Sequence, residues 1–177
     1  NWLAGTVSVR TVSSSGPVDA LVRAYGPAVL PPVRLGPDGE RVLYLEPGGW
    51  TVVASSETYG IEQEDVAVVP GQDALVKVEF EHVLLDSGAS SFLLAVQDID
   101  GQPIAGATVQ LGDQDYSSPE GGTVVLKDIA PGAYSVRVSA PGYEPLAEQR
   151  LTLVEGNQTR TLTLGFVEQP VSVAVQT

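Results

Sequence analysis

The residues that could support catalysis are few in this chain of 177 residues. A serine or cysteine nucleophile needs a base beside it, but the sequence contains one histidine, His82, and no cysteine. No Gly-x-Ser-x-Gly motif surrounds a serine. Zinc sites need cysteine or several histidines, so a zinc enzyme is excluded. We therefore predict that the chain is not an enzyme, and that His82 is a solvated residue between two domains.

Carboxylates are the remaining candidates for a metal site. Asp113, Asp115 and Glu120 lie in one acidic segment, and carboxylate oxygens are the ligands that calcium prefers. These three residues are the calcium candidates, and no other cofactor is expected.

Asp98 and Asp100 also resemble the start of a calcium loop, but no glutamate follows at the EF-hand spacing. A hairpin turn explains this pair better. Because consecutive antiparallel strands reverse direction, the turn at 98–102 and the loop at 112–121 are expected at opposite ends of the fold. One shared site is therefore not expected.

Aromatic side chains outside a core could stack on sugar rings. Trp2 and Tyr116 are the candidates for such ligand binding, whereas Trp50 and Tyr134 are expected in the core or at its corners.

The composition restricts the partners. The chain has 22 acidic and 9 basic residues, a net charge of −13 and 43% hydrophobic residues. This charge repels nucleic acid and anionic lipid, while the apolar content is sufficient for a packed core. No run of about 18 apolar residues is present, so no transmembrane segment is expected. The absence of methionine, even at position 1, suggests a chain that begins after a removed segment or was cut from a longer protein.

An internal repeat organises the sequence. "LEPGGWTVVASSETYG" (45–60) aligns with "IAPGAYSVRVSAPGYE" (129–144), and the proline and final tyrosine pairs both differ by 84 positions (131 − 47 and 143 − 59). Repeats of this period indicate a tandem array. We predict a divergent repeat at 2–81, a linker at 82–90 and a second repeat at 91–166. Residues 167–177 are either the first strand of a third repeat or a closing strand.

Alternation of apolar and polar residues, as in "YSVRVSA", predicts strands, and Gly-containing turns recur every 8–12 residues. The fold class is therefore all-β, with two tandem antiparallel β-sandwich domains of Ig-like or transthyretin-like type. The strands expected in the second repeat are 92–97, 105–111, 122–127, 133–139, 148–154 and 158–164.

The second repeat resembles the carboxypeptidase regulatory-like domain, a transthyretin-like sandwich. The resemblance rests on "AVQDIDGQPIAGATVQLGD" and "EGGTVVLKDIAPGAYSVRVSAPGYE", which include the Asp100-Gly101, Pro131-Gly132, Tyr134 and Gly142-Tyr143 positions. The first repeat departs from this pattern, since the Gly-Ala step is missing and Trp50 stands in place of tyrosine. The resemblance implies a non-catalytic sandwich appended to enzymes, receptors or bacterial surface and periplasmic proteins.

The related Cna-B-type pilin and adhesin domains can carry a Lys–Asn isopeptide bond promoted by a buried glutamate. Here Val138, or Ala54 in the first repeat, occupies the position expected for that glutamate. Lys77 and Lys127 are the only lysines, and neither lies on a first strand. No isopeptide bond is expected.

The predicted function is a structural or interaction module, a segment of a tandem β-sandwich rod or stalk in an exported bacterial surface or periplasmic protein. Its expected partners are neighbouring domains of the same polypeptide. One alternative is a carbohydrate- or protein-ligand-binding module, with a role in adhesion, that uses the loops at 112–121 and 140–147. The other is an accessory domain of an enzyme that lies outside this segment.

Overall fold

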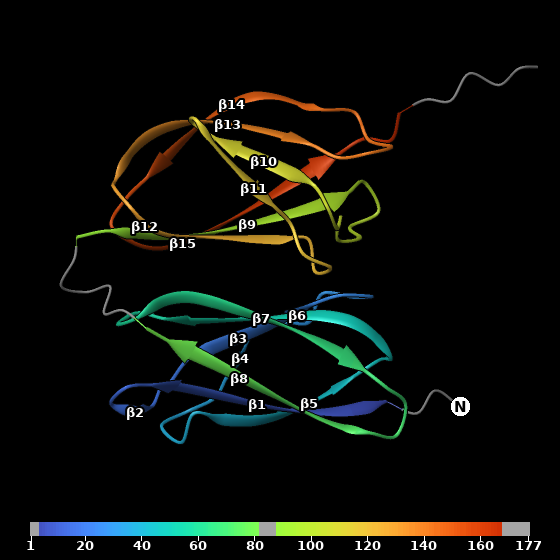
Figure 1. The fold of residues 1–177 in the computed structure, drawn as a ribbon, viewed down its shortest axis with the longest axis vertical. Helices are drawn as coiled ribbons and strands as arrows, with labels where there is room; N and C mark the ends of the chain where they lie inside the picture. Colours follow the sequence, from blue (N-terminus) through green and yellow to red (C-terminus); the bar gives the residue numbers. More distant parts are fainter. Residues whose placement is uncertain (1–3, 82–87, 168–177) are drawn as a thin grey trace, which may run out of the picture.

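The structure, a computed structural model, describes residues 4–81 and 88–167 (Figure 1). All regular elements in these two ranges are β-strands, which confirms the all-β prediction. The strands form four sheets, and in Figure 1 these sheets are stacked along the longest axis of the molecule.

The first two sheets form the N-terminal sandwich. One sheet has the order β2-β1-β5 with β8 also paired to β1, and the other has the order β4-β3-β6-β7. Val7 and Val9 of β1, Trp50 and Phe80 fill the space between the two sheets. The strands are β1 (Gly5–Ser13), β2 (Gly16–Pro17), β3 (Leu21–Tyr25), β4 (Val33–Arg34), β5 (Glu40–Leu45), β6 (Gly48–Ser56), β7 (Gly60–Val68) and β8 (Asp73–Phe80).

The other two sheets form the C-terminal sandwich, with the orders β12-β9-β15 and β11-β10-β13-β14. Its core is a separate cluster that includes Phe92, Leu94, Val136 and Leu151. The strands are β9 (Ser90–Asp98), β10 (Thr108–Leu111), β11 (Gln114–Ser117), β12 (Thr123–Ile129), β13 (Gly132–Ser139), β14 (Leu146–Leu153) and β15 (Gly156–Leu164).

Each of the strands predicted in the second repeat is present, but two features differ from the prediction. The short polar strand β11 was expected to be loop, because "QDYS" has no apolar alternation. In addition, each sandwich contains one parallel pair, β1 with β8 and β9 with β15, in place of purely antiparallel sheets. The first and last strands of each repeat become neighbours because the chain between them crosses to the other sheet and back.

The repeated Pro-Gly-x-aromatic sequence forms the same corner in both sandwiches. The indole Nε1 of Trp50 donates to the backbone oxygen of Glu46 at 2.8 Å, and the hydroxyl of Tyr134 donates to the backbone oxygen of Ala130 at 2.7 Å. The intervening glycine has a φ of 145° in the first corner and 156° in the second, which favours a residue without a Cβ. The identical spacing therefore preserves a side-chain-to-backbone bond that fixes the start of β6 and β13.

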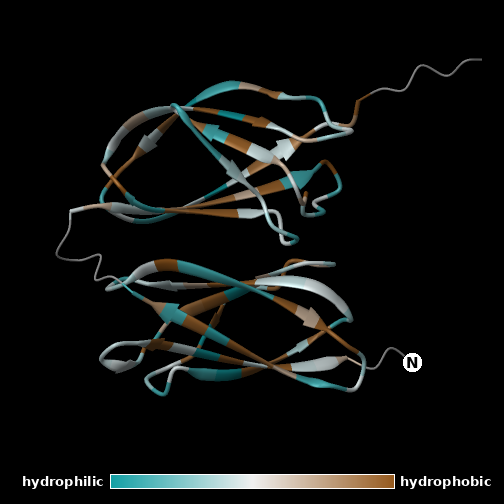
Figure 2. Ribbon diagram, in the orientation of Figure 1, coloured by the Kyte–Doolittle hydropathy of each residue, from teal (hydrophilic) through white to brown (hydrophobic). Residues whose placement is uncertain are grey.

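Two strands break the expected alternation. In β13 only the inward side chains are fully buried, whereas Trp50 through Ala54 of β6 are buried on both faces. In β9 both faces are buried as well, although β1 at the same place in the first repeat alternates. Figure 2 shows hydrophobic residues along both β6 and β9, which lie on the facing sides of the two sandwiches. Buried outer faces indicate that the sandwiches dock against each other.

The predicted boundaries 2–81, 82–90 and 91–166 stay predictions, although β9 begins at Ser90, inside the expected linker. Residues 168–177 lie outside the described ranges, so the role predicted for the segment 167–177 is untested.

Candidate functional site

Among the ligand-binding candidates, Trp2 lies outside the described residues, as does His82. Tyr116 is not an exposed platform. Strand β11 pairs with β10, which places Tyr116 opposite the buried Val109, and the tyrosine packs partly buried against the C-terminal core. Its hydroxyl donates to the side-chain oxygen of Gln114 at 3.0 Å. The ring is thus less free than expected, and a ligand-binding role of Tyr116 stays an untested expectation.

The calcium candidates are not brought together. Asp113 lies in the turn between β10 and β11, and Asp115 is exposed on β11. The Glu120 side chain lies against Gly49 of the N-terminal sandwich instead. Within the described ranges no group of three or more acidic or histidine side chains is arranged to hold a metal ion. Calcium binding stays an untested expectation.

The hairpin interpretation of Asp98 and Asp100 is confirmed, because the Asp98 carboxylate accepts bonds from the backbone nitrogens of Asp100 and Gln102, both at 2.9 Å. The turn at 98–102 and the loop at 112–121 were expected at opposite ends of the C-terminal sandwich, and this expectation is wrong for the second half of that loop. Strand β11 carries the chain back, and the Val96 nitrogen donates to the Gly122 oxygen at 2.7 Å. This return brings Glu120 and Gly121 to the docking face between the sandwiches.

The docking interface is a small apolar cluster between the sheet β4-β3-β6-β7 and the sheet β12-β9-β15. Its members come from both sandwiches and are 2–7% exposed: Tyr25, Val53, Ile61, Leu93 and Ala95, with the partly buried Val125 beside them. Burial of this kind stabilises by about 25 cal/mol per Å² of apolar surface removed from water. The two sandwiches are therefore held by more than their covalent linker.

Polar contacts surround this cluster. Gln63 and Thr123 make a reciprocal pair, in which Gln63 Nε2 donates to the Thr123 backbone oxygen at 3.2 Å and Thr123 Oγ1 donates to Gln63 Oε1 at 2.7 Å. Asn157 Nδ2 donates to the Ser56 backbone oxygen at 2.8 Å. Lys127 forms an ion pair with Glu62. Directional bonds of this kind fix the register of one sandwich on the other, because each needs a defined geometry.

Two buried hydrogen bonds that share the Thr51 hydroxyl lie beside the apolar cluster. The backbone nitrogen of Gly121 donates to Thr51 Oγ1 at 2.9 Å, and the same hydroxyl donates to Asp65 Oδ1 at 2.6 Å. Thr51 is fully buried. A Cβ on Gly121 would lie 2.4 Å from Thr51 Cβ, so the approach of the two backbones needs glycine at this position.

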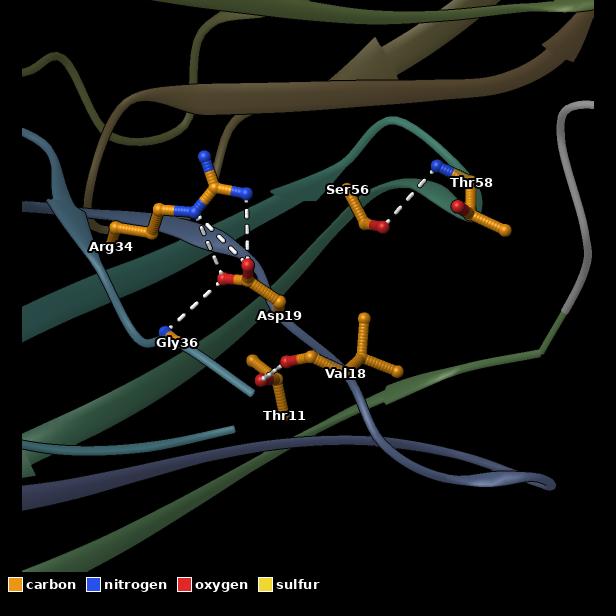
Figure 3. Close-up of polar contacts among 7 residues, drawn as sticks. All are labelled: Thr11, Val18, Asp19, Arg34, Gly36, Ser56 and Thr58. Carbon is orange, nitrogen blue, oxygen red and sulfur yellow. Dashed lines mark hydrogen bonds and ion pairs between the residues drawn. The ribbon is translucent and has the colours of Figure 1, made fainter. Parts of the chain in front are cut away.

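A cleft at the edge of the interface has a volume of about 600 Å³. Asp19, Arg34, Ser55 and Thr58 line it from one sandwich, and Asn157 lines it from the other. Figure 3 shows the carboxylate of Asp19 between the Arg34 guanidinium and the backbone nitrogen of Gly36. Arg34 Nη2 donates to Asp19 Oδ2 at 2.8 Å.

The ion pair between Asp19 and Arg34 keeps both side chains of the cleft in their charged forms. The hydrogen bond from Arg34, followed by its positive charge, lowers the pKa of Asp19, which also accepts a backbone bond from Gly36. The same pairing raises the pKa of Arg34. Because both groups are ionised and compensated by each other, neither is prepared for proton transfer at neutral pH.

The sequence analysis missed this docking interface. The sequence does contain a signal for it in two strands. In β9 the run "FLLAV" is apolar throughout, whereas the equivalent segment "VSVRT" of β1 alternates. In β6 the run "WTVVA" has no charged residue, whereas the equivalent segment "YSVRV" of β13 alternates.

Comparison with known proteins finds a family model that matches the C-terminal sandwich. A model of the carboxypeptidase regulatory-like domain matches residues 94–165, which confirms the resemblance predicted for the second repeat. No curated relative matches the chain at a significant level.

Several solved structures are similar to the chain. A minor pilin of Streptococcus agalactiae is 12% identical, with 96% of this chain and 99% of that chain covered and a TM-score of 0.44. A streptococcal ancillary pilin is 12% identical over 94% of this chain and 63% of that one, with a TM-score of 0.42. The Bacillus anthracis TIE protein is 14% identical, with a TM-score of 0.40, and the match covers 93% of this chain but 34% of that protein.

Proposed function

Starting from the match of the C-terminal sandwich to the carboxypeptidase regulatory-like domain, we propose that the chain is a non-enzymatic structural module of an exported, cell-surface protein. In this proposal the two sandwiches act as one stiff spacer, because their sheets dock face to face. The observation that carries the proposal is the mixed apolar and hydrogen-bonded interface around Ile61 and Leu93.

Stiffness is the property that a spacer needs. A sandwich joined only by a flexible linker reorients freely, whereas a buried contact with directional bonds restricts it to one arrangement. Ile61 is 2% exposed and Leu93 is 3% exposed, and both become solvated if the sandwiches separate. Separation therefore costs the apolar contact together with the Gln63–Thr123 bonds.

The polar groups of the interface support a structural role over a catalytic one. The Thr51 hydroxyl and the Gln63 amide are both occupied in contacts between the sandwiches or within them. The Asp19–Arg34 pair compensates its own charges. Groups already satisfied by protein partners have little capacity left for a reacting substrate.

A polar ligand such as a glycan is the second candidate, and the observation in its favour is the cleft of about 600 Å³ with its hydroxyl and amide groups. Glycan-array binding that is lost on Thr58→Val and kept on Thr108→Val, an exposed residue on the other sandwich, would favour this candidate. Absence of binding across glycan classes would favour the spacer function over glycan binding.

The spacer is tested by nuclear spin relaxation and small-angle scattering of the full chain. We expect both sandwiches to share one rotational correlation time, and the scattering to fit a single elongated particle. Ile61→Asp buries a charge in the interface and should give two shorter correlation times. Ile99→Asp makes the same change at a residue that is 66% exposed and should leave the single correlation time unchanged. Independent motion in the unsubstituted chain would refute the spacer.

A further inference from the structure

The first and last strands of each sandwich are parallel neighbours. β1 pairs with β8, and β9 pairs with β15, in each case in parallel register. Because parallel strands run in the same direction, the chain enters each sandwich at one end of its sheets and leaves it at the other end.

The entry end of the N-terminal sandwich meets the C-terminal sandwich at Glu120. Gly5, the first residue of β1, lies against the Val68 side chain, and Val68 pairs with Gly48 at the start of β6. The next residue of β6, Gly49, lies against the Glu120 side chain. The segment that precedes β12 therefore contacts the end of the N-terminal sandwich at which the chain enters.

The same segment lies beside the exit of the C-terminal sandwich. The Gly122 oxygen accepts a bond of 2.7 Å from the nitrogen of Val96, near the end of β9. Leu164, the last residue of β15, pairs with Asp98, the last residue of β9. The chain therefore leaves the C-terminal sandwich at the same end of the docked pair at which it enters the N-terminal sandwich (Figure 1).

The chain passes from one sandwich to the other at the opposite end of the pair. β8 ends there at Phe80, and β9 begins there at Ser90. Asn157 at the start of β15 donates to the backbone oxygen of Ser56 at the end of β6, a bond of 2.8 Å that closes the interface at this end. We call the end near Gly121 the open end and the end near Asn157 the crossing end.

Tension between the entry and the exit of the chain acts differently on the interface and on the sandwiches. Because entry and exit both lie at the open end, the pull draws the two sandwiches apart there and reaches the interface contacts one after another. Inside each sandwich, the pull acts on the first and last strands in opposite directions along their length. Eight residue pairs join β1 to β8 and nine join β9 to β15, so this force is divided among many ladder contacts.

The interface also buries less apolar surface than either core. Among the described residues its cluster has five buried members, whereas the core of each sandwich has sixteen. Apolar stabilisation grows with the area removed from water, so the interface separates at a lower cost than a core. Charged groups also lie on the two docked faces, namely Arg23, Asp65 and the ion pair of Lys127 with Glu62. Water hydrates these groups when the faces separate, which favours opening without unfolding.

We propose that the docked pair is a reversible extension element, in which tension between the two chain ends opens the interface from the Gly121 contact toward the Asn157 contact while both sandwiches stay folded. The inference rests on the proposed spacer function and adds that the spacer lengthens under tension. β1 and β15 have nine residues each, or roughly 30 Å at about 3.3 Å per residue. Opening therefore separates entry and exit by up to about 60 Å, two strand lengths placed end to end.

The test is to stretch single molecules of the full chain between handles on its two termini in optical tweezers. We expect a first event that lengthens the molecule by up to about 60 Å and reverses when the force is lowered. Two larger events should follow, because unfolding of the 75 residues from Ser90 to Leu164 (164 − 90 + 1) releases a chain of roughly 250 Å.

A matched pair of variants assigns the first event to the interface. Thr123→Val keeps the shape of a buried side chain and removes its bond to Gln63 Oε1, so the first event should occur at a lower force and the later events at unchanged forces. Thr108→Val makes the same change at an exposed residue of β10 and should leave all three forces unchanged.

Three results would overturn the inference: a first event of the larger size, lengthening without a separate short event, or equal effects of the two variants on the first event. Spin relaxation of the chain without tension tests the spacer separately. One shared correlation time together with the absence of the short event would therefore refute the extension and leave the spacer in place.

Discussion

Substitution of Gly121 by alanine adds one methyl group to the C-terminal sandwich and should disturb its contact with the N-terminal one. The new Cβ would lie 2.4 Å from both Cβ and Oγ1 of Thr51 and 3.0 Å from the backbone oxygen of Tyr25. Ordinary contact begins at 3.4 Å, so the two segments must move apart by about 1.0 Å (3.4 − 2.4) to restore it. The atoms concerned belong to the base of a buried side chain and to the backbone, and neither can rotate away.

The expected cost has two parts. Insertion of a methylene into a packed contact typically costs about 1–3 kcal/mol. The separation also lengthens the bond from the Gly121 nitrogen to Thr51 Oγ1, a contribution of about 0.5–1.5 kcal/mol. Because the contact can relax by opening, we expect the total to lie near 2 kcal/mol rather than at the sum of the upper limits.

Urea unfolding followed by the fluorescence of the buried Trp50 measures this change, and spin relaxation reports whether the sandwiches separate. Gly165→Ala is the matched control, because its added Cβ has 3.8 Å to the nearest atom, Glu144 Oε2. The control should change the unfolding free energy by less than about 0.5 kcal/mol. Equal stability and equal relaxation of the two variants would refute the account of Gly121 as a contact residue.

Two further predictions concern the repeated corner and the cleft. Trp50→Phe removes the bond from Nε1 to the Glu46 oxygen and leaves a cavity in the core, so the unfolding free energy should fall by at least about 1 kcal/mol in thermal unfolding. Tyr134→Phe removes one bond from an exposed hydroxyl and should lower the unfolding free energy by less. Equal losses in the two variants would contradict this ranking. The lowered pKa of Asp19 contributes stability that is present above the unfolded-state pKa and is lost as the pH falls through the folded-state pKa. The unsubstituted chain should therefore be more stable than Asp19→Asn at neutral pH, and this difference in unfolding free energy should shrink below about pH 4. An advantage that stays constant from pH 7 to pH 2 would show that the Asp19 carboxylate is not linked to folding.

The sequence alone determined the features of this protein that depend on local physics. Alternation of apolar residues predicted the strands, the Pro-Gly spacing predicted two equivalent corners, and the burial of Trp50 followed from its place after the turn. These signals are local because a strand exposes its two faces alternately and a turn needs glycine where φ is positive.

The tertiary structure decided which faces are covered. No local rule states that the outer face of β6 packs on the outer face of β9, or that β11 returns Glu120 and Gly121 to that contact. The parallel pairing of β9 with β15 was likewise decided by the path of the chain between the sheets. An outer sheet face becomes buried only when another surface lies over it, and the position of that surface is set by residues far away in the sequence.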